Sequence, residues 1–324
     1  MKRIAILVTA QTNMASMDNP RCAFLFVNEL LSKRGEPPLF DLKIAGTEKD
    51  VTLENGWYTL HPDMTYQEIR ATDLIIIPAF DGDLKEVILH NKPVLPWLVR
   101  QYKEGTEIAS LCVGAFLLAA TGLLNGKTCS THWRATEAFR EVFPDVCLQT
   151  EKIITDEDGI YTSGGAFSSA NLILYLIEKY AGRVMAVQCA KMFQVDMDRK
   201  SQSPFMIFKG QKNHKDKRIQ KAQQYIEENY QEKITVNQLC REVALGRRSF
   251  ERRFKTATDN TIVEYIQRVK IEAVKKRLET TRMTVNELMY EVGYTDTKSF
   301  RNVFRKVTGL SRFEYRQKFN KNVG

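Results

Sequence analysis

Cys112 is the residue whose type and setting could support covalent chemistry. It lies between a short apolar run and a helix-like run in ASLCVGAFLLAATG, residues 109–122, with Gly114 two positions later. A nucleophile held on a sharp strand-to-helix turn needs a small residue at that place because the backbone packs tightly there. Amide groups at the start of the following helix would favour a thiolate. Cys112 is therefore a candidate catalyst, sensor or pocket wall.

Two other side chains could work with this thiol. His132 follows another predicted strand in Thr131-His132-Trp133, and Asp18 is expected in the loop after the first strand. Pockets of α/β domains form at the carboxyl ends of their strands. A satisfied structural histidine and a solvated loop acid are the alternatives for these two residues. The remaining cysteines are expected to be structural, and since none has metal-ligand spacing, no metal, disulfide or cofactor is expected: Cys22, Cys129, Cys147, Cys189 and Cys240.

The elements that would position these residues alternate between strand and helix patterns. Continuous apolar runs at Ile4–Val8, Leu74–Pro78 and Ile108–Leu111 predict buried parallel strands. Helical patterns follow each run, around 21–33, 84–102 and 113–121, and a further pair of strands is expected around the turn at 156–159. This alternation predicts a doubly wound, mostly parallel α/β domain over residues 1–200. No run is long enough to span a membrane.

Charge is distributed unevenly along the chain. Residues 201–324 hold 27 Lys and Arg against 14 Asp and Glu, whereas residues 1–200 hold 21 against 25. A basic C-terminal third favours an acidic polymer as partner, with nucleic acid the first candidate. Residues 201–216 are expected to be a linker, and only helical patterns follow them.

An internal repeat defines residues 217–320. Aligning 235–267 with 284–317, with one residue inserted in the second copy, gives 13 identities in 33 positions. Capping-box patterns mark four helix starts, at residues 235–238, 261–264, 284–287 and 311–314. Each copy has the pattern of helix, short turn and helix, which is a helix-turn-helix unit whose second helix enters the major groove. A helix over about 262–280 would join the two units.

The second helix of each copy has one apolar and one polar face. Phe250 and Phe254, like Phe300 and Phe304, are four residues apart and are expected to be buried. Arg can contact guanine, Asn can contact adenine, and Lys more often holds phosphate. The residues expected to contact DNA are Arg247, Arg248, Glu251, Arg252, Lys255, Thr297, Lys298, Arg301, Asn302, Arg305 and Lys306.

Residues 217–318 resemble the AraC-type DNA-binding domain. The matching stretches are SFERRFK (249–255), EYIQRVKIEAVKKRLE (264–279), EVGYTDTKSFRNVFRKVTG (291–309) and EYRQKF (314–319). Arg312 departs from the proline that this family commonly has after Ser311, with little consequence expected because the capping pattern is retained. The resemblance implies a double helix-turn-helix domain that binds promoter DNA.

Residues 4–195 resemble the PfpI-like domain of the class I glutamine amidotransferase-like superfamily, as in GlxA-family regulators. The stretches that carry the resemblance include IAILVTA, DLIIIPAF and ASLCVGAFLLAATGLLNGKTCSTHW. Enzymes of the PfpI type have histidine directly after the cysteine, where this chain has Val113, and relatives usually have glycines where Ala79 and Phe80 stand. These departures indicate a pocket rather than an active site, with Asp18, Cys112 and His132 as vestigial catalytic candidates. The expected pocket residues are Asp18, Ala79, Phe80, Cys112, Val113, His132 and Trp133.

The sequence therefore predicts a cytoplasmic, sequence-specific transcription regulator that is not an enzyme. Its first domain would bind a small effector or mediate dimerisation, and its partners would be double-stranded promoter DNA, a second copy and, for an activator, RNA polymerase. Three alternatives remain open: a hydrolase- or amidase-like cysteine enzyme fused to a DNA-binding module, a redox sensor acting through Cys112, and an inert dimerisation scaffold.

Overall fold

The computed structural model describes residues 1–320, and the chain divides into two compact units, Met1–Gln202 and the part that begins at Ser203. The first unit is built on a seven-stranded sheet in the order β10-β11-β7-β6-β1-β2-β5, in which only the pairing of β10 with β11 is antiparallel. Its strands are β1 (Lys2–Val8), β2 (Phe40–Gly46), β5 (Met64–Thr65), β6 (Leu74–Ile77), β7 (Glu107–Ser110), β10 (Ile154–Glu157) and β11 (Ile160–Ser163).

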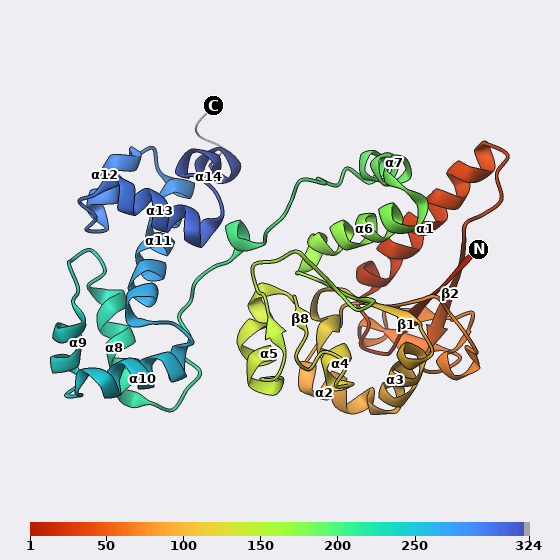
Figure 1. The fold of residues 1–324 in the computed structure, drawn as a ribbon, viewed down its shortest axis with the longest axis horizontal. Helices are drawn as coiled ribbons and strands as arrows, with labels where there is room; N and C mark the ends of the chain where they lie inside the picture. The colour runs from red at the N-terminus through yellow and green to blue at the C-terminus, as the bar shows by residue number, and fades with distance from the viewer. Residues whose placement is uncertain (321–324) are drawn as a thin grey trace. The chain divides into compact units, whose positions relative to one another are not determined.

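Alternate residues of the central strands enter two separate cores. In β1, Ile4, Ile6 and Val8 face one apolar layer, while Ala5 and Leu7 face the other. Helices cover both layers (Figure 1). The first layer contains α1 (Met14–Lys33), α6 (Ser169–Ala181) and α7 (Arg183–Phe193); the second contains α2 (Leu84–His90), α3 (Leu95–Lys103), α4 (Ala115–Ala120) and α5 (Thr136–Val142). The predicted doubly wound α/β fold is confirmed.

Three local predictions for this unit need correction, and one strand was missed. The first helix begins at Met14, because the Asn13 side chain accepts a hydrogen bond from the Ser16 amide and caps it. Asp18 therefore lies in α1 and not in a loop. The pattern at 84–102 forms two helices, interrupted by a 3-10 turn at Lys92–Val94 that contains a proline. Strand β2 was not predicted, since its partly exposed residues break the apolar run.

In the described part of the second unit, residues 203–320, all regular secondary structure is helical, and the helices enclose two cores. Its helices are α8 (Lys217–Glu228), α9 (Val236–Glu242), α10 (Arg247–Thr258), α11 (Ile262–Thr280), α12 (Val285–Glu291), α13 (Thr297–Thr308) and α14 (Arg312–Phe319). One core joins α8, α9 and α10 to the first half of α11, and the other joins α12, α13 and α14 to its second half. Helix α11, about 28 Å long at about 1.5 Å per residue, therefore belongs to both helix-turn-helix units.

Caps fix the ends of these helices, with one departure from the sequence pattern. Reciprocal capping boxes are formed at Thr261, Thr284 and Ser311. At Thr235 only half of the expected box is present: its side chain accepts from the Gln238 amide, but the Gln238 side chain donates to the Tyr225 hydroxyl instead. The boundary of α9 is nevertheless where the sequence predicts it.

Within residues 1–320, no helix is both long enough and apolar enough to cross a membrane.

Candidate nucleic-acid interface and effector pocket

The two second helices of the helix-turn-helix units, α10 and α13, are anchored by equivalent aromatic clusters. Phe250 and Phe254 are fully buried in the first helix-turn-helix unit, and Phe300 and Phe304 are fully buried in the second. Phe254 packs edge-on against Tyr265, with ring centroids 5.3 Å apart, and Phe304 packs in the same way against Tyr315 at 5.6 Å. The buried faces expected from the sequence are confirmed, and they turn the opposite face of each helix outward.

Every residue expected to contact DNA is exposed on this outward face. On α10 they are Arg247, Arg248, Glu251, Arg252 and Lys255, and on α13 they are Thr297, Lys298, Arg301, Asn302, Arg305 and Lys306. The two helices differ in how much of their positive charge is already paired. Within the described residues no ion pair involves Lys298, Arg301 or Arg305, whereas Arg247 pairs with Glu251 at 2.9 Å on α10.

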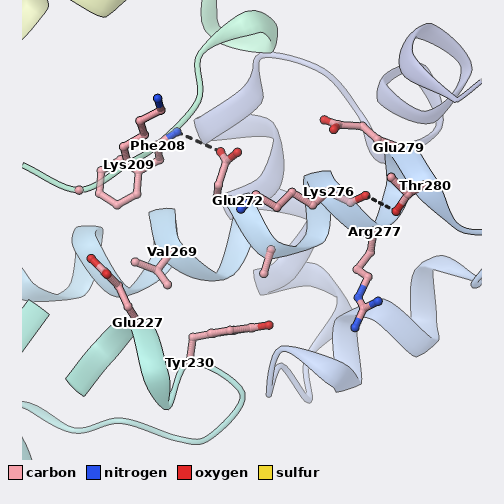
Figure 2. A pocket seen from close by; sticks show the side chains of 12 residues that line it. Phe208, Lys209, Glu227, Tyr230, Val269, Glu272, Lys276, Arg277, Glu279 and Thr280 are labelled. Atoms are coloured by element: carbon pink, nitrogen blue, oxygen red, sulfur yellow. Dashed lines mark hydrogen bonds between the residues drawn. The ribbon is translucent and has the colours of Figure 1, made fainter. Parts of the chain in front are cut away.

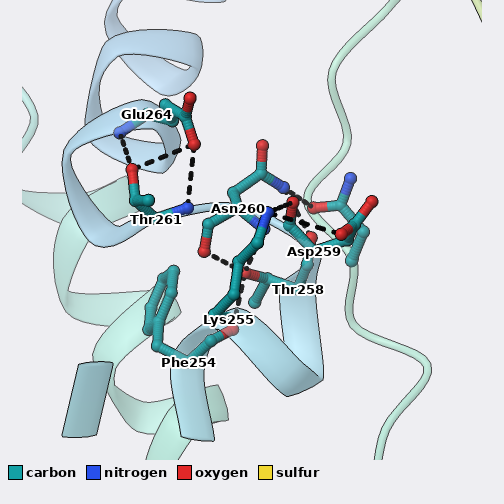
Figure 3. Close-up of polar contacts among 8 residues, drawn as sticks. Phe254, Lys255, Thr258, Asp259, Asn260, Thr261 and Glu264 are labelled. Atoms are coloured by element: carbon teal, nitrogen blue, oxygen red, sulfur yellow. Dashed lines mark hydrogen bonds and ion pairs between the residues drawn. The ribbon is translucent and has the colours of Figure 1, made fainter. Parts of the chain in front are cut away.

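Lys255 has a structural contact at the end of α10. Its ammonium donates to the Asp259 carbonyl at 2.6 Å and lies 3.4 Å from the Asp259 carboxylate, as Figure 3 shows. Asp259 is the left-handed residue at the C-terminal end of α10, so the Lys255 ammonium donates to a carbonyl at the negative end of that helix. Lys306 of α13 lies 3.8 Å from Glu264 at the start of α11. Both lysines have intramolecular partners that phosphate would compete with.

The strand-to-helix turn at Cys112 in the α/β unit, called the elbow below, has the geometry expected for a turn that holds a nucleophile. Cys112 has φ +56, in the left-handed region that non-glycine residues rarely adopt, and lies directly between β7 and α4. A Cβ on Gly114 would lie 2.5 Å from the Pro78 carbonyl oxygen, so only glycine allows the turn to pack against the end of β6. The small residue required two places after the cysteine thus has a direct steric cause.

The chemical state of the thiol differs from that of an activated nucleophile. Burial raises the pKa of Cys112, and the nearby Asp81 carboxylate raises it further, although the backbone amides of Ala166 and Val113 oppose this shift. Asp81 was not predicted as a site residue. Its position after Phe80, beyond the carboxyl end of β6, was the available signal.

Backbone amides near the elbow already have acceptors. The Ala79 amide donates to the Ser16 hydroxyl at 2.8 Å, and the Cys112 amide donates to the Ser163 hydroxyl at 3.3 Å. Ala79 and Phe80 are both buried, as expected for a wall. An oxyanion at this turn would have to displace these intramolecular bonds, which weakens the case for acyl-transfer chemistry.

His132 lies beside the loop that contacts the thiol. Thr131 donates to the Cys112 carbonyl at 2.9 Å, and a Cβ on Gly165 would lie 2.0 Å from the His132 ring. Burial lowers the pKa of His132, and the Arg134 charge lowers it further, so both favour the neutral form of the ring. Its Nδ1 accepts from the Arg134 amide at 3.1 Å. Trp133 is next to it, with ring centroids 5.6 Å apart.

The polar contacts of Asp18 are to residues of its own helix. Its carboxylate pairs with Arg21 at 2.5 Å and accepts from the Cys22 thiol at 3.4 Å, all on consecutive turns of α1. The contacts of Asp18 are therefore local to its helix, and the acid that acts on Cys112 is Asp81. The elbow itself packs through Gly114 against the Ile77 and Pro78 carbonyls at the end of β6.

The segment expected to be a linker is attached to folded parts at both of its ends. Gln202 is buried in the first unit, where it accepts from the Gly165 amide at 3.1 Å and donates to the Thr131 carbonyl at 2.9 Å. In the second unit the Phe208 amide donates to Glu272 at 3.1 Å, a bond drawn in Figure 2. Phe208 and Glu272 belong to the lining of a cavity of about 630 Å³ alongside α11.

Comparisons with known proteins place both units. Residues 29–179 match the DJ-1/PfpI family, and residues 239–318 match a helix-turn-helix domain of the AraC type. The transcriptional regulator GbdR of Pseudomonas aeruginosa is 26% identical over 257 residues, covering 79% of this chain and 69% of GbdR. The regulator GlxA of Rhizobium meliloti is 20% identical over 213 residues, covering 65% of each chain.

Two further comparisons concern the first unit. Isonitrile hydratase of Pseudomonas putida is 24% identical over 156 residues, 48% of this chain and 64% of that enzyme. The crystal structure of a protein from Vibrio parahaemolyticus, assigned as a transcriptional regulator, aligns with a TM-score of 0.53 at 21% identity, over 59% of this chain and 98% of that one. That structure supports the fold alone. The recognition made from the sequence is confirmed: the chain joins a DJ-1/PfpI-family domain to an AraC-type helix-turn-helix domain.

Proposed function

We propose that this chain is a sequence-specific transcription regulator whose residues 217–320 bind promoter DNA through α10 and α13. The observation that carries the proposal is the presence of two recognition helices, each with a buried phenylalanine pair and an exposed basic face, on one shared helix. Relatives named as helix-turn-helix regulators support it. A helix about 28 Å long between the two helix-turn-helix units suits two recognition helices that are spaced near one DNA turn of about 34 Å.

The proposed partners follow from this activity. Regulators with helix-turn-helix domains bind paired half-sites as dimers, so we propose a homodimer on promoter DNA, with RNA polymerase as a further partner if the protein activates transcription. Such a protein works in the compartment that holds the chromosome, which is the cytoplasm of a bacterium.

For the α/β unit, residues 1–202, we propose a pocket that binds a small effector and does not catalyse a reaction. Three observations favour this over an enzyme: the raised pKa of Cys112, the Ala79 amide bonded to Ser16, and the lowered pKa of His132, whose Nδ1 accepts from the backbone. The pocket would be walled by Ala79, Phe80, Cys112, Val113, His132 and Trp133, with Asp81 in place of Asp18. The relation to isonitrile hydratase keeps cysteine-dependent catalysis as the second candidate.

Gln202 offers a route from this pocket to the DNA-binding unit. It contacts Gly165, which packs on His132 and precedes Ala166, the residue whose amide acts on the Cys112 thiol. Gln202 is followed directly by the segment that docks on α11 through Phe208. An effector that moves the 164–166 loop would change the hydrogen bond between the Gly165 amide and the Gln202 side chain. That change would in turn shift the population of arrangements that bind DNA.

Selection from a pool of random-sequence duplexes, using the full chain, tests the DNA-binding role. We expect enrichment of duplexes with two preferred segments about one turn apart, and affinity that falls steeply with salt, as phosphate contacts require. A chain that retains no duplex above the level of an acidic control polymer would refute the proposal. A chain that retains duplexes without sequence enrichment would refute its sequence-specific part.

The alkylation rate of Cys112 by iodoacetamide against pH tests the pocket without turnover. Because burial raises its pKa, the thiolate is scarcer at pH 7 than in a free cysteine, and the midpoint should lie above the free-thiol value of about 8.5. Mass spectrometry of the modified peptides separates Cys112 from the exposed Cys147. A midpoint well below about 8.5 would instead support the enzyme or the redox sensor, and these are separated by turnover that Cys112→Ser abolishes or by oxidant-dependent DNA binding that Cys112→Ala abolishes.

A further inference from the structure

Lys270 is a buried cation at the middle of α11, the helix shared by the two helix-turn-helix units. Its side chain is 6% exposed, and burial lowers its pKa. The ammonium donates to the Glu232 carbonyl at 3.0 Å and to the Val292 carbonyl at 2.6 Å. Removing an ammonium from water is unfavourable, so an arrangement of this kind persists only where the hydrogen bonds made in return are good.

The two carbonyls belong to different helix-turn-helix units. Glu232 lies in the loop between α8 and α9 of the first unit, and Val292 is the residue that ends α12 in the second. The ammonium at the end of α12 also satisfies a carbonyl that the helix leaves free, with favourable charge. One side chain thus links the backbones of both units.

Direct backbone packing accompanies this link. Gly293 follows Val292 in the turn of the second unit, with φ +71. A Cβ placed on it would lie 2.2 Å from the Gln231 carbonyl oxygen and 3.1 Å from the Lys270 ammonium. The loop of the first unit and the turn of the second are therefore in contact at Gly293, beside the lysine.

Outside this point the buried residues of the two units form separate cores, although Tyr230, two residues before Glu232 in the same loop, packs against the second core. The apolar core of the first includes Tyr265 and Ile262 from α11, and that of the second includes Ile271, Val274 and Leu278. Lys270 lies between the two sets. Without it, the angle between the units would depend on α11, on the backbone contact at Gly293, on the packing of Tyr230 and on the exposed pair of Lys306 with Glu264.

We propose that Lys270 is a positioning residue that fixes the two helix-turn-helix units to each other and so sets the spacing and rotation of the two DNA segments they bind. The proposal rests on the proposed function, because it requires both units to bind DNA. Each inserted base pair rotates the second segment by about 34° around the duplex, since one turn holds 10–10.5 base pairs. Two recognition helices that are held rigidly to each other cannot follow that rotation, so their affinity for the altered duplex falls.

The test uses the full chain and duplexes built from the sequence that the wild type selects. One base pair is added or removed between the two preferred segments, and affinity is measured by fluorescence anisotropy. The wild type should lose at least about tenfold in affinity for either change, about 1.4 kcal/mol. Lys270→Met should bind the original duplex more weakly and lose less than about threefold when the spacing changes.

Lys275→Met is the matched control. Lys275 is also buried on α11, but it pairs with Glu272 and donates to the Met206 carbonyl, so it does not link the two helix-turn-helix units. It should keep the wild-type spacing penalty. Lys270→Gln, which retains an N–H donor without the charge, replaces Lys270→Met if circular dichroism shows that the methionine variant is unfolded.

The outcomes separate the two proposals. A folded Lys270→Met or Lys270→Gln protein with the wild-type spacing penalty overturns the positioning role and leaves DNA binding intact. Equal loosening by Lys275→Met also overturns it, because the effect would then come from general destabilisation of α11. Selection of a single segment by the wild type overturns the two-unit binding itself, before any variant is compared.

Discussion

In both helix-turn-helix units the second phenylalanine of the buried pair packs edge-on against a tyrosine, and the tyrosine hydroxyl donates to a glutamate. Tyr265 donates to Glu227 at 2.8 Å in the first unit, and Tyr315 donates to Glu279 at 2.6 Å in the second. Glu227 lies on α8 and Glu279 on α11, so α11 serves the second unit as α8 serves the first. The repeated residues are those that hold the recognition helix in place.

The units differ at the turn, the cap and the outer face. The turn has Ala244 at φ +50 in the first unit and Gly293 at φ +71 in the second. Helix α10 begins after Gly246 without a side-chain cap, whereas the Asp296 carboxylate accepts from the Ser299 amide at the start of α13. On the proposed function, a repeated frame with two different surfaces would let one architecture contact two different DNA segments.

The largest effect is expected at the second turn. Gly293→Ala adds a Cβ that meets the Gln231 carbonyl and forces alanine into a left-handed conformation. We expect the free energy of unfolding of the second helix-turn-helix unit to fall by about 3 kcal/mol. Urea unfolding followed by circular dichroism measures this. Tryptophan fluorescence should be unchanged, because all three tryptophans, at 57, 97 and 133, lie in the α/β unit, residues 1–202.

Gly246→Ala is the control for that experiment. Gly246 has a negative φ and open space where a Cβ would be, so its replacement should cost less than about 1 kcal/mol. If Gly293→Ala is no more destabilising than Gly246→Ala, the contact between the two units at Gly293 does not constrain the turn.

The next effect concerns the outer faces. Arg301→Ala should cost about 2 kcal/mol of DNA-binding free energy and relax preference at one base position, because arginine can bond guanine bidentately. Lys306→Ala should weaken binding to all sequences and lower the salt slope by about one. Affinities on the selected duplex and on a random duplex at several salt concentrations separate these effects. Equal losses on both duplexes for Arg301→Ala would rule out a base-contacting role.

A smaller effect is expected at the cap that only the second unit has. Asp296→Ala removes the acceptor for the Ser299 amide and should lower the stability of the second unit by about 1 kcal/mol, while Asp296→Ser should keep most of it. The midpoint of urea unfolding at constant slope reports the change. Equal stability of the alanine and serine variants would show that the cap contributes nothing.

The smallest effect is a gain in stability. Ala244 has the strained left-handed conformation that its counterpart Gly293 adopts without penalty, so Ala244→Gly should stabilise the first unit by about 0.5 kcal/mol, the relief of strain exceeding the entropy of glycine. The same unfolding experiment measures it. A loss of stability would mean that chain entropy outweighs the relieved strain at this turn.

Local signals in the sequence were sufficient for the second unit. Helix α11 has the predicted bounds, because the Thr261–Glu264 capping box marks its start. The position of the elbow at Cys112 was also predictable, since Gly114 is close in sequence. The state of that elbow was not predictable: Ser16 and Ser163, which occupy its amides, and Asp81, which acts on the thiol, are brought to it only by the folded sheet.

The most direct test of the account is to map base preference for substitutions on each recognition helix. The full chain with Arg252→Ala on α10, and separately with Asn302→Ala on α13, would be used to select from random duplexes. If both recognition helices bind DNA, each substitution should relax preference in a different one of two segments, about one helical turn apart. Loss of preference at the same positions for both variants, or at none, would contradict DNA binding by two recognition helices.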